Sequence, residues 1–71
     1  MRTFTRQMVL SALAAVTTEA PPPGTVLESH TLLDIAEHLA AQFDFPNWDR
    51  LVRIVRAQLG RIYIINRLYR N

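Results

Sequence analysis

The sequence predicts a small, mainly helical domain with three helices in a helix-turn-helix-like arrangement and at most a small β element. Three observations predict this class. The chain has 71 residues, 49% of them hydrophobic, which suffices for one modest core. Apolar residues recur at helical spacing in three segments. A Pro/Gly loop over residues 20–25 separates the first two segments, so we expect one domain, 1–71, with a linker there.

The first helix is expected to begin after Thr5, whose hydroxyl can cap it. Phe4 and Val9 then have the spacing of a hydrophobic staple, which fixes the direction from which the chain enters the helix. The apolar face consists of Val9, Ala12, Leu13 and Val16. Because the prolines of the loop cannot continue a helix, we expect the helix to end near Thr17, with a very short strand near residues 25–27 after the loop.

A second helix is expected to begin near Thr31, with Thr31 as its cap and Asp34 as the reciprocal partner of a capping box. Its apolar face consists of Leu32, Ile35, Ala36, Leu39 and Phe43. Asp34, Glu37 and His38 fall off that face. Pro46 restricts the residue before it to an extended conformation, so the helix should end ahead of this proline.

A third helix is expected after Asn47, which can cap it. At about 100° per residue, Arg50, Arg53 and Arg56 fall on one side of this helix. The opposite side carries Trp48, Leu51, Val52, Val55 and Leu59. Ile54 is the one apolar residue outside this apolar stripe, and Asp49 has the i, i+4 spacing of an ion pair with Arg53.

After Gly60 the sequence allows two interpretations. The β-branched and aromatic residues favour a strand near residues 61–66, whereas Ile62, Ile65 and Leu68 also have helical spacing. Either way, Tyr63 and Tyr69 alternate with arginines, which are Arg61, Arg67 and Arg70. Such a mixture can stack on bases and neutralise phosphates. The alternative is that the segment is a closing element with two half-buried tyrosines.

Charge is distributed unevenly along the chain. Residues 1–49 contain two arginines and six acidic residues, a net charge of −4, whereas residues 50–71 contain six arginines and no acidic residue, a net charge of +6. The basic third indicates phosphate backbones, acidic protein surfaces or anionic lipid as partners. The alternative is that these arginines solubilise a helix and pair with the acidic half.

The order helix, loop with short strand, helix, arginine-faced helix and terminal strand resembles the winged helix-turn-helix family over most of the chain. In that family a small residue is buried in the second helix, here matched by Ala36, and the third helix is the recognition helix, here matched by residues 47–60. The resemblance implies a DNA-binding transcription regulator. Leu51 lies fifteen residues after Ala36, so the turn is about five residues longer than the family pattern, and no Asn-Gly or Asp-Gly turn marks a wing hairpin.

A second class is also open, that of small protein-binding modulators such as phage-encoded regulators that dock on host RNA polymerase, or docking domains of larger assemblies. Arginine, tyrosine and tryptophan are enriched in protein hot spots as well as at nucleic-acid interfaces. DNA is the leading partner and RNA polymerase or another acidic protein surface the alternative. The expected binding residues are Arg50, Arg53, Arg56, Arg61, Tyr63, Arg67, Tyr69 and Arg70.

Catalysis, metal binding and membrane insertion are not expected. His30 and His38 have no carboxylate at metal-ligand spacing, and neither serine lies in a nucleophile motif. No stretch approaches the roughly 18 to 20 apolar residues of a membrane-spanning helix. With no cysteine, a disulfide framework is excluded. We therefore expect a cytoplasmic protein that is not an enzyme, needs no cofactor, and has an oligomeric state that the sequence does not indicate.

Overall fold

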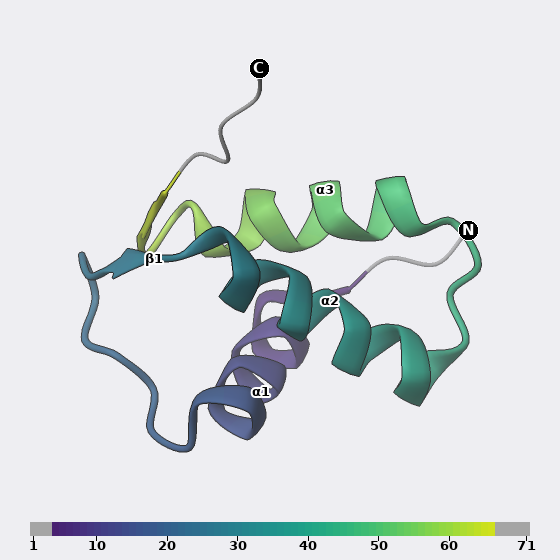
Figure 1. The fold of residues 1–71 in the computed structure, drawn as a ribbon, viewed down its shortest axis with the longest axis horizontal. Helices are drawn as coiled ribbons and strands as arrows, with labels where there is room; N and C mark the ends of the chain where they lie inside the picture. The colour runs from purple at the N-terminus through teal and green to yellow at the C-terminus, as the bar shows by residue number, and fades with distance from the viewer. Residues whose placement is uncertain (1–3, 67–71) are drawn as a thin grey trace.

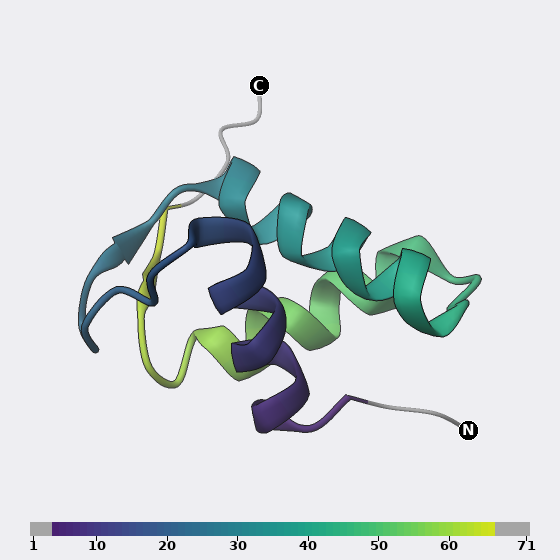
Figure 2. The ribbon, with the colours of Figure 1, turned by 90° about the horizontal axis from the view of Figure 1, so that it is seen from below.

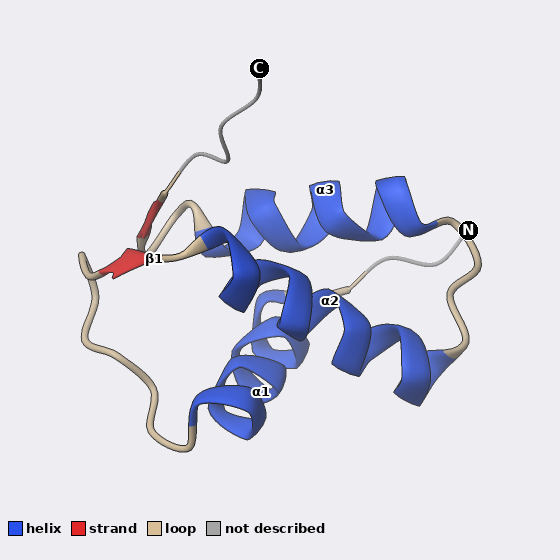
Figure 3. Cartoon of the chain, viewed as in Figure 1, coloured by secondary structure: helices blue, strands red, loops and turns tan. Residues whose placement is uncertain are grey.

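The structure, a computed structural model, describes residues 4–66, which form three helices and two short strands (Figures 1 and 3). The elements in chain order are α1 (Arg6–Thr17), β1 (Val26–Leu27), α2 (Ser29–Phe43), α3 (Trp48–Leu59) and β2 (Ile64–Ile65). The mainly helical class with a small β element is confirmed. Residues 61–66 contain the predicted strand and not a fourth helix, since β2 and its flanking turn occupy them.

The three helices pack against one another around a shared core (Figures 1 and 2). Every residue predicted to be buried at the centre of this core is buried, and each has 1% exposure or less. These residues are Leu13, Ile35, Leu39, Leu51, Val55 and Leu59. The helical phases read from the sequence are therefore correct for all three helices.

The start of α1 confirms the predicted cap and agrees with the staple. The Met8 N–H donates to Thr5 Oγ1 over 3.2 Å. Phe4 and Val9, on either side of the cap, are both buried in the core. The cap satisfies a backbone amide that the helix cannot satisfy itself, and the two apolar residues fix the chain before the helix begins.

The exit from α1 is strained. Thr18 has φ 70° and ψ −43°, and the Glu19 N–H donates across it to Thr17 O over 2.6 Å. This is the geometry of a γ-turn with a positive φ, which is rare for residues that carry a Cβ. The Thr17 hydroxyl holds the turn in place, because it donates to Leu13 O over 2.7 Å.

We expect Thr18→Gly to raise the free energy of unfolding by about 1 kcal/mol, because the relief of strain exceeds the backbone entropy that a glycine adds to the unfolded chain. Thermal or urea denaturation measures the change. Ala20→Gly is the matched control, since its φ is not positive, and it should lower stability by a few tenths to about 1 kcal/mol. Equal losses in the two variants would show that Thr18 stores no strain.

The Pro/Gly loop is tied to the segment that follows α3. Gly24 has φ 87° and forms a turn in which the Thr25 N–H donates to Pro22 O over 3.2 Å. The Gly24 N–H donates to Ile62 O over 2.8 Å. The strands then pair in parallel, Val26 with Ile64 and Leu27 with Ile65. This contact closes the fold between residues nearly forty positions apart.

The start of α2 corrects one prediction. The helix begins at Ser29, two residues before the predicted cap, so Thr31 lies inside its first turn. Glu28 occupies the cap position without a side-chain capping bond, and its carboxylate accepts instead from Asn66 Nδ2 over 3.0 Å. Because β1 ends at Leu27, directly before the cap, strand pairing and not a capping side chain sets the start of this helix.

The turn between α2 and α3 carries an aromatic cluster formed by Phe4, Phe43 and Phe45. The ring centroids of Phe4 lie 5.6 Å from Phe43 and 5.4 Å from Phe45. These spacings are typical of favourable aromatic pairs.

Trp48, predicted to lie on the buried stripe of α3, is 42% exposed. This prediction is wrong because Trp48 is the first residue of the helix, at an end of the core where the phenylalanines pack.

Candidate nucleic-acid interface

The outward side of α3 carries the arginines that the sequence predicted to lie together. Leu51, Val55 and Leu59 face the core, each with 0% exposure. Arg53 and Arg56 are exposed, and Arg50 is half-buried. From Arg50 to Arg56 the helix rises by about 9 Å, so the three cations follow one another along two turns. The helix begins as predicted, with Arg50 N–H donating to Asn47 Oδ1 over 3.1 Å.

A shallow depression of about 400 Å³ lies beside Arg50 and Arg53. Its lining residues share one side of α3, because their spacing is i, i+3, i+7 and i+10 with Arg53 beside them. They are Asn47, Arg50, Arg53, Ile54 and Ala57. Ile54 and Ala57, which the sequence analysis did not assign to the site, contribute an apolar patch between cations. The sequence contained a signal for this placement, because Ile54 and Ala57 follow Arg50 at the helical spacings i+4 and i+7.

Arg53 does not pair with the acidic residue of its own helix. Among residues 4–66 the structure forms no ion pair between Asp49 and Arg53, although the sequence predicted one. Arg61 is also exposed, in the turn that follows the helix. The positive field therefore extends beyond the end of α3. An exposed row of cations attracts anionic partners over a distance set by the ionic strength.

The position of α3 is fixed by contacts that the sequence did not reveal. Gln58 Nε2 donates to Phe4 O over 3.2 Å, which ties the last turn of α3 to the start of the described chain. The aromatic cluster holds the turn before α3 against the same Phe4. Phe4 thus contacts the last turn of α3 and the segment that precedes this helix. Neither contact has a local sequence signal, because each joins residues about forty to fifty-four positions apart.

Tyr63 does not belong to the proposed interface. Its side chain is 6% exposed, and its hydroxyl donates to Pro21 O over 2.8 Å. The ring is therefore part of the core and is not available for stacking on a base. The hydroxyl ties the Pro/Gly loop to the chain after α3, in agreement with the alternative interpretation of a tyrosine on a closing element. Arg67, Tyr69 and Arg70 lie outside the described residues.

We expect Tyr63→Phe to lower the free energy of unfolding by about 1 kcal/mol, because the partly buried Pro21 carbonyl loses its donor while the ring is kept. DNA binding by this variant should equal that of the wild type. Chemical denaturation and a parallel binding assay check the two expectations. Unchanged stability combined with weakened DNA binding would place Tyr63 at the interface after all.

Comparisons with protein families, characterised proteins and solved structures find no match to this chain. The resemblance to the winged helix-turn-helix family stays a prediction. The strand pairing within residues 4–66 is parallel and joins β1 to β2. A wing formed by an antiparallel hairpin is thus not present in the described part of the chain.

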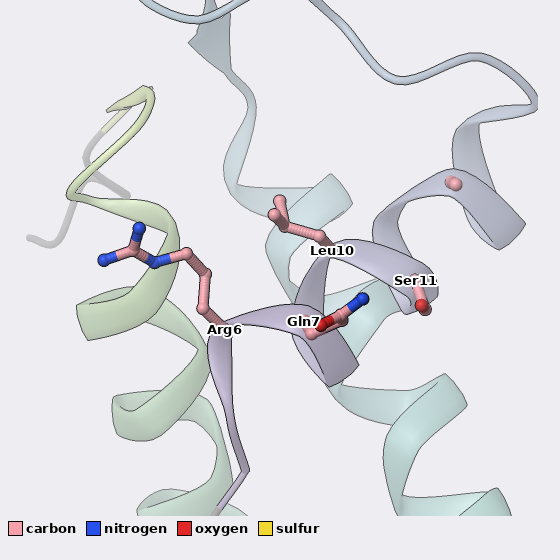
Figure 4. A pocket seen from close by; sticks show the side chains of 5 residues that line it. Arg6, Gln7, Leu10 and Ser11 are labelled. Carbon is pink, nitrogen blue, oxygen red and sulfur yellow. The ribbon is translucent and has the colours of Figure 1, made fainter.

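Within residues 4–66 no three His, Asp or Glu side chains group as metal ligands. None of the described helices has the length and apolar character needed to cross a membrane. Another depression, of about 440 Å³, is lined by α1 residues, four of which Figure 4 labels. Because Arg6, Gln7, Leu10 and Ser11 all come from one helix, this depression is an open face of α1.

Proposed function

We propose that this protein is a small, non-enzymatic transcription regulator of the cytoplasm that contacts DNA through the arginines of α3. The observation that carries the proposal is the separation of the two sides of this helix. One side is buried, and the other exposes Arg53 and Arg56 with Arg50 half-buried beside them. Arginine binds phosphate in a bidentate manner and also pairs with guanine edges.

The dimensions of α3 support this assignment. Its 12 residues span about 18 Å, and the major groove of B-DNA, about 12 Å wide, admits a helix. The contacts of Phe4 with the last turn of α3 and with Phe45 before the helix favour a rigid reading surface, because a fixed helix pays little ordering entropy when it binds. Arg61 extends the cationic surface past the helix, where it would meet the phosphate backbone.

A titration of binding to random-sequence duplex DNA against salt tests the proposal. Three phosphate contacts would give a slope of log K against log salt of about −2.7, a loss of roughly 40-fold between 50 and 200 mM salt. Fluorescence anisotropy of labelled DNA measures this slope. Absence of binding at 50 mM salt would reject DNA as the partner.

A second candidate function is docking on a protein such as RNA polymerase. The observation that favours it is the apolar pair of Ile54 and Ala57 within the arginine depression, because a protein partner would bury both. The same salt titration separates the candidates. A complex held by an apolar contact weakens little with salt, whereas phosphate binding weakens steeply.

A further inference from the structure

Two surfaces of opposite charge lie on opposite sides of the described chain. The first, named here the ridge, is the outward side of α3. It consists of Arg50, Arg53, Ile54, Arg56 and Ala57. The second, named here the groove, follows the seam between α1 and α2. With three helices around one core, the outward side of one helix lies across the core from the seam between the other two (Figures 1 and 2).

The groove is made of two adjoining depressions of about 380 and 390 Å³ that share His38. At one end Asp34 and Glu37 line it beside Val16. At the other end its lining is mostly apolar or neutral. Those residues are Met8, Ser11, Ala12, Gln42 and Phe43. The groove thus combines an acidic end with a largely uncharged one, over about two helical turns of α2.

The ridge has the complementary composition. Arg53 and Arg56 are exposed cations, and Ile54 and Ala57 line a depression together with Arg50 and Arg53. Ile54 packs against the core but keeps part of its side chain exposed. A seam between two helices is a surface that accepts a third helix through its apolar and charged side chains. Such a groove would cover Ile54 while its acidic end pairs with the arginines.

We infer that the ridge of one molecule docks into the groove of a second copy of this chain, with Arg53 and Arg56 facing Asp34 and Glu37. The occupant is assigned by charge complementarity, since Asp34 and Glu37 line the groove while Arg53 and Arg56 are exposed cations of the ridge. The interface is head-to-tail, because the two surfaces differ and lie on opposite sides. Such an interface leaves one ridge and one groove free at the ends, so association continues into a ring or an open chain.

Self-association does not depend on DNA binding, although it covers the same arginines. DNA and the acidic groove would therefore compete for the ridge. Only molecules that have dissociated from other copies would present these arginines to DNA. Competition of this kind lowers the apparent affinity for DNA as the protein concentration rises.

Sedimentation velocity of the whole chain tests the inference at 50 mM salt. The wild type should increase in mean mass between about 10 μM and 1 mM. The groove variant Asp34→Arg/Glu37→Arg and the ridge variant Arg53→Glu/Arg56→Glu should each stay monomeric over that range. Glu19→Arg, a charge reversal on an exposed loop residue outside the groove, is the control and should associate within twofold of the wild type.

Mixing the two variants tests the pairing of the two surfaces. The intact ridge of the groove variant fits the intact groove of the ridge variant, and the two reversed surfaces are again of opposite charge, so we expect the mixture to associate although each variant alone does not. A wild type that stays monomeric at 1 mM overturns the inference, as does failure of two folded variants to combine. Circular dichroism of each variant confirms folding. DNA binding by the groove variant, measured in parallel, separates this outcome from failure of the DNA proposal.

Discussion

The Leu39→Ala variant should unfold with a free energy about 2 to 5 kcal/mol below that of the wild type. Leu39 lies in the middle of α2 with 1% exposure, in the core that joins all three helices. Removal of its side chain loses the transfer free energy of the buried atoms and leaves a cavity that packed neighbours fill only in part. Small domains have a total stability of only about 5 to 15 kcal/mol, so this variant should be close to unfolding at ambient temperature.

Leu33→Ala is the matched control for this prediction. It makes the same substitution in the same helix, at a side chain that is 37% exposed. Its free energy of unfolding should fall by well under half of the Leu39→Ala loss, because much of the side chain is already in water. Urea denaturation of both variants gives the comparison. Equal losses at the two positions would contradict the phase of α2 and with it the orientation of the core.

The triple variant Arg50→Ala/Arg53→Ala/Arg56→Ala should lose nearly all binding to duplex DNA. A hydrogen bond to a charged group contributes about 1.5 to 3 kcal/mol, so each arginine that contacts phosphate contributes roughly tenfold or more in affinity. The remaining salt slope should lie near zero, or near −0.9 if Arg61 alone contacts a phosphate. Fluorescence anisotropy at 50 mM salt provides the measurement.

The fold of the triple variant must survive for this loss to be informative. Arg53 and Arg56 are exposed, and alanine is the best helix former, so these two changes should leave the thermal midpoint close to that of the wild type. Arg50 is half-buried, so Arg53→Ala/Arg56→Ala serves as a second variant that keeps it. A folded double variant with wild-type affinity for DNA would exclude α3 as the interface.

Local signals in the sequence predicted most of the helical architecture. Thr5 and Asn47 cap α1 and α3 as expected, because each cap joins a side chain to an amide three residues away. The buried faces followed from spacing alone. The same spacing placed Arg50, Arg53 and Arg56 on the opposite side of α3 from the core, which is the basis of the candidate site.

The features that the sequence did not predict depend on distant partners. Thr31 is not the cap of α2, because the paired strand β1 sets where that helix begins. Tyr63 packs in the core, and its hydroxyl donates to Pro21 O, 42 residues earlier in the chain. Trp48 lies on the predicted apolar stripe but beyond the end of the core. Helical periodicity gives the direction of a side chain, whereas burial also requires a neighbour in that direction.

The salt dependence of DNA binding by Arg53→Ala beside Arg53→Lys tests the central claim most directly. Both variants lose the guanidinium, but the lysine keeps the positive charge. If Arg53 contacts a phosphate, the alanine variant should show a slope shallower by about 0.9 and the lysine variant the wild-type slope, with a modest loss of affinity. Identical slopes for the wild type, Arg53→Ala and Arg53→Lys would contradict a DNA interface on the arginine side of α3.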